Sequence, residues 1–516
     1  MNTVSTDASP PNEDRHDVAI VGCGPTGLVA AVLLAQRGHR VVVLERFADP
    51  YPLPRAVHFD HEVGRILQAC GVGAEVREII EPADVYEWRN GEGVPLLRFG
   101  TAGDAPSGWP SASMFTQPAL EAILERRARS LGTIDVRRGV EITGVHDVGG
   151  VGGVGGVGGV GGSVSLVAAD GSEVSASYVI GADGANSTVR AALGVDMIDL
   201  GYFYDWFIVD VILDRPRVYD PINLQICDPV RPTTAVSGGP GRRRWEFMRL
   251  PDEDPEEFAN GARAWELLES WDVRPDNARL ERHAAYTFQA RYAETWRRGR
   301  VFLAGDAAHQ TPPFAGQGMC AGIRDAANLA WKLDLVLRGA AADSLLDTYG
   351  SERLPHVRQA IEFAIELGKV ICVPDPAEAA ARDAAMSAAV TADPIPTPGL
   401  PGLVGGCTDP DAPLAGHLFV QGAVDGRPFD DVHGAGWRLV TIDDPVSIDP
   451  VLGEWFAAIG GSVVGVDAAD PTFGRWFDEH PVRGALQRPD FHLFGTAADA
   501  TAASALLTNL RARLIG

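Results

Sequence analysis

The spacing of hydrophobic and polar residues predicts alternating strands and helices from about residue 17 onward. The stretch "DVAIVGCGPTGLVAAVLLAQRGHRVVVLER", from Asp17, contains an apolar strand, a glycine-rich turn, an apolar helix and a second apolar strand. This order within about thirty residues is typical of a βαβ unit. The chain is therefore expected to open as an α/β protein.

Further along the chain, the same patterns predict two more groups of elements. Helices are expected near residues 61–70 and 118–131, and strands within 133–185. The pattern becomes strand-rich from about 200 to 290, as in "YDWFIVDVIL" and "RRRWEFMRL". Helix returns after Gly318 and is expected to continue, with breaks, to about residue 371.

Four stretches stand apart by composition. Residues 1–16 are polar with two prolines and are expected to form a disordered tail. The repeat "VGGVGGVGGVGGVGG", 148–162, offers too little side chain to pack, and we interpret it as a flexible hairpin extension. Residues 373–415 are rich in Pro, Ala and Gly and are interpreted as a linker. Residues 416–516 alternate strands and helices and predict a small α/β domain.

Composition limits the classes of partner. The 516 residues allow two or three domains, and 46% hydrophobic with 22% charged residues is typical of a globular protein. A formal net charge of -25 argues against nucleic acid or an anionic membrane as a partner. Neither a signal-peptide pattern nor a run of about 18 apolar residues is found, so a cytoplasmic location is expected.

The distribution of cysteines also favours a cytoplasmic location. The six cysteines are scattered, with no CxxC pair and no spacing typical of zinc ligands. This pattern suits free thiols in a reducing compartment, and no metal site is expected.

The first motif with chemical meaning is Gly22-x-Gly24-x-x-Gly27, which follows an apolar strand and precedes a helix. The first glycine makes the tight turn, the second lets the backbone approach a pyrophosphate, and the third allows close packing of helix and strand. Glu45 ends the next strand, where its carboxylate can accept both hydroxyls of an adenosine ribose. The alternative is a glycine turn that only packs, which leaves Glu45 unexplained. The residues expected to hold the dinucleotide here are Gly22, Gly24, Pro25, Thr26, Gly27, Glu45 and Arg46.

Two further motifs end apolar strands. "YVIGADGANSTVR" reaches Asp183-Gly184, and "VFLAGDAAHQTPPFAGQGM" reaches Gly305-Asp306. Together with the first motif, they resemble the three fingerprints of the single-component flavin-dependent aromatic hydroxylases, over roughly residues 17–370. The resemblance implies a Rossmann-like FAD-binding domain, a β-sheet substrate domain and a C-terminal thioredoxin-like α/β domain.

The resemblance also implies how FAD is held. Asp306 would bind a ribityl hydroxyl, and the small residues after it would lie against the isoalloxazine ring. The helix that starts after Gly318 would point its N-terminus at the ring, where its amides and dipole favour negative charge. For Asp183 a structural alternative stays open, in which it caps the helix that follows. The expected further FAD contacts are Arg55, Gln117, Asp183, Gly184, Gly305, Asp306, Pro313, Gly316, Gln317, Gly318 and Met319.

The domain boundaries follow from the same resemblance. The FAD-binding domain is expected to comprise residues 17–199 and 285–372, and the substrate domain residues 200–284 with about 84–112. The stretches "PRAVHFDHE", "CDPVRP" and "RRWEFM" resemble the bacterial 3-(3-hydroxyphenyl)propionate/3-hydroxycinnamate hydroxylases. The C-terminal "RWFDEHPVRGALQRPDFHLFGTA" resembles the end of those enzymes, which implies that residues 416–516 form a thioredoxin-like domain. That domain lacks CxxC, so we interpret it as structural or as a homodimer contact.

The implied activity is a monooxygenation. NADH or NADPH would reduce FAD, O₂ would add at the flavin C4a, and the resulting hydroperoxide would hydroxylate a small phenol, such as 3-hydroxyphenylpropionate, ortho to its hydroxyl group. Two alternatives stay open. One is a flavin monooxygenase acting on a polyketide-type aromatic or by Baeyer–Villiger chemistry, and the other is a non-catalytic FAD-binding protein.

Several residues are candidates for handling the phenol. His58 follows the Arg55 loop and titrates near neutrality, although a surface histidine is an equal alternative. His309, beside the flavin loop, could equally be a hydrogen-bonded structural residue. The candidate catalytic residues are His58, Pro313, Tyr204 and Gln225. Aromatic residues at strand spacing, which are more often core than ligand contacts, are Tyr204, Trp206, Tyr286 and Phe288. The candidate clamps for a substrate carboxylate are Arg231, Arg244 and Arg291.

Overall fold

The computed structural model describes most of the chain. The described residues are 15–100, 105–148, 162–390, 393–396, 399–442 and 448–515. The expected tail and the glycine repeat lie almost wholly outside them. In the described part of the chain, no helix is both long enough and apolar enough to cross a membrane.

A largely parallel sheet forms the centre of the N-terminal part. The expected βαβ unit is confirmed as β1 (His16–Val21), α1 (Pro25–Ala35) and β2 (Val41–Glu45). The sheet order is β17-β18-β11-β1-β2-β8, and β2, β1, β11 and β18 pair in parallel. Their carboxyl ends therefore meet at one edge, where ligands bind in open α/β sheets. The other strands of this sheet are β8 (Ile134–Arg138), β9 (Ile142–Val148), β10 (Ser163–Ala168), β11 (Glu173–Gly181), β17 (Arg297–Arg298) and β18 (Val301–Leu303).

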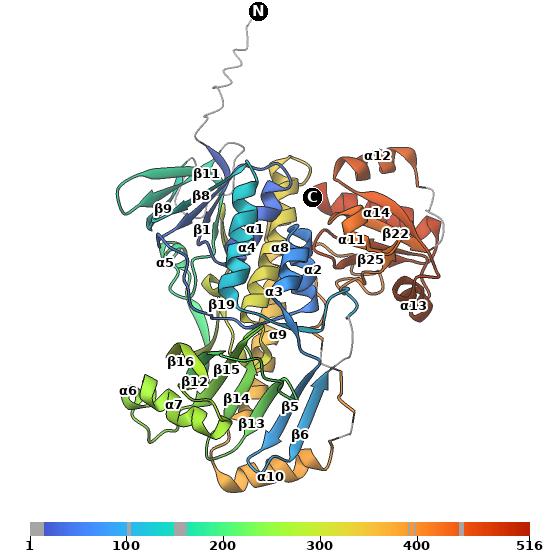
Figure 1. Ribbon diagram of the computed structural model, residues 1–516. Helices are drawn as coiled ribbons and strands as arrows, with labels where there is room; N and C mark the ends of the chain where they lie inside the picture. Colours follow the sequence, from blue (N-terminus) through green and yellow to red (C-terminus); the bar gives the residue numbers. More distant parts are fainter. Residues whose placement is uncertain are drawn as a thin grey trace, which may run out of the picture.

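Helices cover this sheet, and three of them lie side by side against it: α1, α4 (Gln117–Ser130) and α8 (Gly318–Leu337) (Figure 1). Residues Val18 to Ile20 of β1 and Val41 to Leu44 of β2 are fully buried beneath them. The remaining helices of this part are α2 (His61–Ala69), α3 (Gly73–Ile79), α5 (Thr188–Ala192) and α9 (Asp347–Ile371). The helices expected near 61–70, over 118–131 and after Gly318 are thus confirmed.

A second sheet of eight strands lies below the first in Figure 1. Its order is β19-β16-β12-β15-β14-β13-β5-β6, so it collects strands from separate segments of the chain. One face packs against α6 (Pro255–Phe258) and α7 (Gly261–Leu268) through a cluster that includes Phe207 and Trp245. The strands are β5 (Val85–Asn90), β6 (Pro95–Gly100), β12 (Met197–Leu213), β13 (Asn223–Cys227), β14 (Thr233–Ser237), β15 (Arg242–Met248), β16 (Ala278–Ala293) and β19 (His309–Gln310).

A small sheet of three short strands accompanies the two large ones. Its order is β3-β7-β4, with β3 (His58–Asp60), β7 (Ala112–Met114) and β4 (Glu81–Pro82). Met114 lies opposite His58 in this sheet. Met114 also receives a hydrogen bond at its sulfur from Asn223 of β13, at 3.4 Å. The strand that carries His58 is therefore joined to the second large sheet.

The segment 373–415 differs from the expected linker, because it contains the helix α10 (Pro376–Ser387). Asp375 caps the helix N-terminus with its side chain, and alanines fill its centre. Alanine has the highest helix propensity, so this composition favours helix rather than an irregular connection. Arg382 of α10 also donates to the carbonyl of Cys227, which fixes the helix to the second sheet.

The C-terminal part lies beside α2 and α8 (Figure 1) and has its own four-stranded sheet of order β23-β22-β24-β25. Its main elements run in the order β22 (Arg438–Ile442), α12 (Pro450–Ala458), β23 (Ser462–Val466), α13 (Pro471–Glu479), β24 (Gly484–Gln487), β25 (Leu493–Ala497) and α14 (Ala500–Ile515). The alternation expected here is confirmed, and the thioredoxin-like assignment stays a prediction. The smaller elements are β20 (Ala423–Val424), β21 (Arg427–Pro428) and α11 (Phe429–His433). All six cysteines of the chain are buried free thiols.

Candidate active site

The three glycine-containing motifs converge at the carboxyl edge of the parallel sheet. Gly22 has a φ of +108°, and a Cβ on it would lie 2.2 Å from the carbonyl oxygen of Ala182, in the second motif. A Cβ on Gly305, in the third motif, would lie 2.8 Å from the hydroxyl of Thr26, in the first. Motifs that lie far apart in the sequence therefore touch one another, and glycine is required at both contacts.

The N-terminus of α1 has the features of an anion-binding site. Gly24 precedes the helix, no side chain among the described residues caps it, and its first turn holds no acid. A Cβ on Gly24 would meet nothing within 4 Å, so this face of the turn is open. Gly27 has no such room, because a Cβ there would lie 2.1 Å from the Gly22 carbonyl oxygen. Open space and unused amides at a helix N-terminus fit the phosphates of a dinucleotide.

Glu45 lies at the end of β2 with both carboxylate oxygens fixed by backbone amides. Cys23 donates to one oxygen at 2.9 Å and Phe47 to the other at 3.0 Å. Each carboxylate oxygen has two lone-pair sites, so one per oxygen is left for another donor. This arrangement fits the two ribose hydroxyls expected from the sequence.

Asp183 acts as a helix cap in this structure. Its carboxylate accepts hydrogen bonds from the hydroxyl of Ser187 and from the amide of Val189 at 3.1 Å, at the start of α5. Burial raises its pKa above the ordinary value. The structural alternative for Asp183 is thus present, and its contact with a cofactor stays a prediction. Gly184 has a φ of +83° and open space on its Cβ side.

Asp306 is exposed, whereas the turn that presents it is held from below. No donor among the described residues hydrogen-bonds the Asp306 carboxylate, and partial loss of its hydration raises its pKa. Asp325 lies under the turn and accepts from the Gly305 amide at 3.0 Å, from His309 at 2.7 Å and from Arg353 at 2.9 Å. Burial alone would raise the pKa of Asp325, but His309 and Arg353 hold it below its ordinary value.

His309 therefore has the structural role that the sequence left open: it is fully buried and bonded to a carboxylate. The unpartnered carboxylate of Asp306 and the fixed turn beneath it fit a hydroxyl-bearing chain such as the ribityl group of FAD.

The loop that precedes α8 contacts His58. A Cβ on Gly316, whose φ is +64°, would lie 2.5 Å from His58 Nδ1. The same nitrogen, His58 Nδ1, lies 3.4 Å from the carbonyl oxygen of Gly316. Burial lowers the pKa of His58, so its imidazole is neutral at neutral pH. No side chain among the described residues caps α8, so the amides that follow Gly318 are free for an anionic group.

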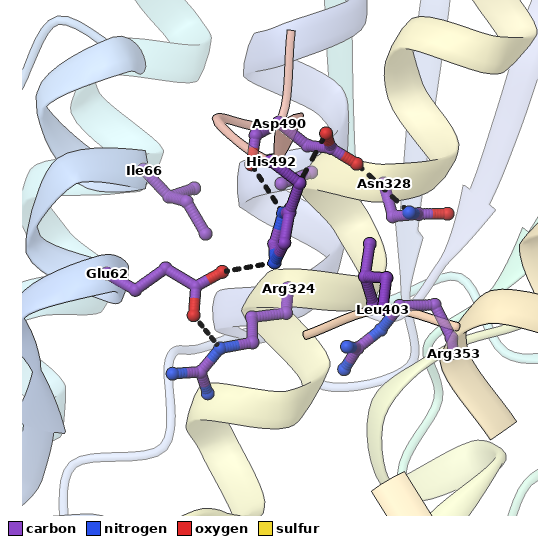
Figure 2. A pocket seen from close by; sticks show the side chains of 9 residues that line it. Glu62, Ile66, Arg324, Asn328, Arg353, Leu403, Asp490 and His492 are labelled. Atoms are coloured by element: carbon purple, nitrogen blue, oxygen red, sulfur yellow. Dashed lines mark hydrogen bonds and ion pairs between the residues drawn. The ribbon is translucent and has the colours of Figure 1, made fainter. Parts of the chain in front are cut away.

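Gln317 is fixed by a chain of buried polar groups that reaches the C-terminal part. Its amide donates to Asp60 at 3.1 Å and accepts from Arg324 at 2.9 Å. Arg324 also bonds Glu62, and the other oxygen of Glu62 lies 3.8 Å from His492 Nε2. Figure 2 shows Glu62 between Arg324 and His492, with dashed lines to both.

The loop before β3 is held by a second network. Gln117 is buried and accepts from the Ala56 amide at 2.8 Å while donating to Glu121 at 2.7 Å. Arg55 is exposed and pairs with the same Glu121 at 3.2 Å. Gln117 thus supports the Arg55 loop from behind. The other residues expected near the cofactor are Arg46 and Pro313, which are exposed, and Met319, which is half-buried.

Aromatic side chains of the second sheet contact Phe314, in the loop that precedes α8. Phe314 contacts the rings of Trp206 at 5.7 Å and Phe288 at 5.9 Å between centroids. Tyr202 contacts both Phe314 and Tyr204. Tyr204 and Phe288 are half-buried, whereas Trp206 is fully buried. An apolar wall therefore faces the loop, and Tyr204 and Phe288 are its accessible members.

Gln225 lies in the same sheet, and its amide oxygen already accepts two hydrogen bonds. It accepts from Tyr86 at 3.2 Å and from Thr234 at 2.7 Å, and it donates to the Thr233 carbonyl at 3.1 Å. Gln225 is fully buried. Its observed contacts orient the half-buried Tyr86 and Thr234.

Two of the three candidate arginine clamps are engaged by the protein. Arg231 pairs with Glu253 at 2.6 Å. Arg244 forms a two-point pair with Asp210 and donates to the Arg55 carbonyl at 2.6 Å. The Nε of Arg291 has no hydrogen-bond partner among the described residues.

Sequence reasoning missed the residues beneath the loops. Asp60, Arg324 and Asp325 fix the turn and loop described above, yet they occur in stretches that look like ordinary polar helix surface. The signal available was "GIRDAANLAWKL", where two opposite charges stand side by side in a helix rich in Ala and Leu. Such charges are almost never fully buried unless they are paired.

Comparisons with known proteins agree with this geometry. The family described as "FAD binding domain" matches residues 15–364. A probable NADH-specific resorcinol 4-hydroxylase from Rhodococcus jostii (strain RHA1) is 40% identical, over 98% of this chain and 97% of the relative. A 3-(3-hydroxy-phenyl)propionate/3-hydroxycinnamic acid hydroxylase from Mycobacterium sp. (strain JLS) is 33% identical, over 84% and 77%. The crystal structure of aklavinone-11 hydroxylase with FAD and aklavinone is 27% identical, covers 98% of this chain and 99% of that one, and has a TM-score of 0.75.

Proposed function

This chain belongs to the family of FAD-dependent aromatic hydroxylases, and on that premise we propose that it hydroxylates a small phenol of the resorcinol type with NADH and O₂. The observation that carries the proposal is the joint placement of the unpartnered Asp306, the open start of α1 and the aromatic wall around Phe314. The identity to the resorcinol 4-hydroxylase supports the substrate class and, through its description as NADH-specific, the reductant.

The division of the chain is part of the proposal. Residues 17–199 with 285–372 would bind FAD, and residues 200–284 with about 84–112 would bind the substrate. Residues 416–516 would be structural or form a homodimer contact. A cytoplasmic location is proposed too, supported by six free cysteines.

When bound, FAD supplies the transfer of electrons from NADH and the activation of O₂. The chain's own residues bind and orient. The amides at the start of α1 would hold the pyrophosphate, Glu45 the ribose, and Asp306 the ribityl hydroxyls. The free amides at the start of α8 would stabilise negative charge on the ring.

His58 would bind the hydroxyl group of the phenol. Its neutral imidazole lies against the flavin loop, and with Nδ1 turned to the Gly316 carbonyl, its Nε2 is left to accept a hydrogen bond from the substrate hydroxyl. Tyr204 and Phe288 of the apolar wall, together with Phe314 of the loop that it faces, would exclude water, which limits wasteful release of H₂O₂.

A polyketide-type aromatic is the second candidate substrate, favoured by the aklavinone-11 hydroxylase, which matches almost the whole chain. One panel separates the candidates: resorcinol, 3-hydroxyphenylpropionate, 3-hydroxycinnamate and an anthraquinone-type polyphenol. The purified yellow holoenzyme should consume NADH faster with resorcinol and form a product that carries one oxygen atom from labelled O₂. NADH consumption without hydroxylated product from any of the four would contradict the proposal, and product from the polyphenol alone would favour the second candidate.

A further inference from the structure

A carboxylate of the substrate sheet has no role in the networks described so far. Glu246 lies in the middle of β15, and its residue is 8% exposed. Its closest cation is Arg244, at 3.7 Å, a distance too long for a hydrogen bond. In the part of the chain that the structure describes, no donor hydrogen-bonds the Glu246 carboxylate. A buried carboxylate without a donor is costly, so its persistence calls for a function.

The face of the sheet on which Glu246 lies is fixed by its neighbours. Alternate residues of a strand share a face, so Arg244, Glu246 and Met248 point to the same side. Arg244 reaches the Arg55 carbonyl, in the loop before β3. Met248 lies opposite Trp206, whose ring contacts Phe314 of the flavin loop. Glu246 therefore lies between two contacts that join this face to the FAD-binding part.

Across β14 and β13, the same face of the sheet leads from Glu246 toward His58. Glu246 lies opposite Thr234, which lies opposite Gln225. Two residues before Gln225 on the same face, Asn223 contacts Met114, the neighbour of His58 across the small sheet. The row that contains Glu246 thus faces the region bordered by His58 and Phe314.

The hydroxyl groups nearest to Glu246 along this row are already used. Tyr86 and Thr234 both donate to Gln225, at 3.2 Å and 2.7 Å. Arg244 is held by Asp210 in a two-point pair. The nearby donors therefore bind other groups, and the Glu246 carboxylate can still accept a hydrogen bond.

We propose that the Glu246 carboxylate accepts a hydrogen bond from a hydroxyl group of the phenolic substrate, an inference that rests on the proposed function. A phenol offers an O–H donor and an apolar ring, which suits a carboxylate on the same face of the sheet as Trp206, whose ring contacts Phe288 and Phe314. Polarising the O–H bond toward an anion raises the electron density of the ring, which favours attack by an electrophilic oxygen. Burial raises the pKa of Glu246 and Arg244 partly offsets this, so a new donor stabilises the charged form.

The test compares a phenol with its methyl ether, because only the phenol can donate. Resorcinol and 1,3-dimethoxybenzene are titrated into the holoenzyme, and binding is followed by the change in the visible spectrum of the flavin. Glu246→Leu should raise the dissociation constant of resorcinol by about tenfold or more, as expected for one hydrogen bond to a charged group. The dissociation constant of the ether should stay within about twofold, because no hydrogen bond to it is lost. Glu246→Gln, which keeps an acceptor oxygen, should restore part of the affinity for resorcinol.

Glu281→Leu is the matched control. Glu281 lies in β16 of the same sheet, which β12 separates from β15, and its carboxylate is paired with Arg242 at 3.1 Å. It should change neither constant. Equal weakening of resorcinol and ether by Glu246→Leu would overturn the inference in favour of a role in shape alone. Unchanged binding of both would overturn it as well. Wild-type enzyme that converts no phenol would instead refute the proposed function, so the two failures are distinguishable.

Discussion

Two regions of the molecule differ in how their buried polar groups are paired. One supports the turn at Gly305 and the loop before α8, and the other is the face of the second large sheet that carries Glu246. Asp325 accepts three hydrogen bonds beneath the turn at Gly305, and Gln317 of the loop before α8 is fixed by Asp60 and Arg324. On the sheet, Glu246 has no donor, and the nearby hydroxyls serve Gln225. A network whose members all form hydrogen bonds holds one shape, whereas Glu246, whose ion pair with Arg244 spans 3.7 Å, keeps its oxygens free to accept a hydrogen bond. This difference underlies the proposed division between residues that hold the site together and Glu246, which would bind the substrate.

The largest effect is expected from breaking the paired region. Asp325→Ala leaves His309 and Arg353 buried without their partner, which should lower the free energy of unfolding by about 3–5 kcal/mol. Urea denaturation of the holoenzyme measures this change. Asp347→Ala is the control, because it removes an exposed aspartate paired with Arg297 and should lower it by less than about 1 kcal/mol. Equal effects of the two substitutions would show that the buried network does not hold the turn.

Asp306 sharpens the comparison, because it is an unpaired group presented by the paired region. Asp306→Ala should weaken FAD binding by about 1.5–3 kcal/mol, the value of a hydrogen bond to a charged group, and leave the unfolding of the apoprotein unchanged. Flavin retained after gel filtration and the FAD dissociation constant measure the loss. Asp306→Asn keeps an acceptor oxygen and should fall between the two. Normal flavin content in Asp306→Ala would refute the assignment to the ribityl chain.

The smallest effect concerns pH and the far end of the paired region, at His492. Burial lowers the pKa of His492, so the unfolded chain binds more protons than the folded chain below the ordinary histidine pKa of about 6.5. The stability that its neutral form contributes is present above that pH and is lost as the pH falls. His492→Asn should therefore make unfolding less sensitive to pH between 7.5 and 5.5, by up to about 1.4 kcal/mol per pH unit.

The control for this pH effect is His146→Asn, at an exposed histidine of β9. Identical pH dependence in wild type and His492→Asn would mean that His492 is protonated equally in the folded and unfolded chain.

Much of the cofactor side was predictable from sequence, because its residues act through short spacings. The tight turn at Gly22, the acid that ends β2 and the turn at Gly305 are each set by local backbone needs. Asp325 and Asp60 could not be found in this way. Their partners come from strands and helices far along the chain, and one charged residue of a helix looks the same in sequence whether it meets water or a buried arginine.

The substrate side was less predictable for a related reason. Gln225 looked like a ligand contact, but Tyr86 arrives from a strand more than a hundred residues earlier and occupies its amide oxygen. Glu246 was passed over within "RRWEFM" although that motif was noted. The sequence does not show that the neighbouring hydroxyls, those of Tyr86 and Thr234, donate to Gln225 and not to Glu246. The helix α10 was missed because its alanines resemble linker composition.

The second large sheet draws β5 and β6 from before α4, β12 to β15 from the middle of the chain, and β16 and β19 from just before α8. The polypeptide crosses repeatedly between its two large sheets, so neither can be produced as a separate fragment by one cut. Chimeras that aim to exchange the aromatic compound accepted would have to replace several stretches at once, and a single crossover between homologous genes would mix halves that were never fitted to each other.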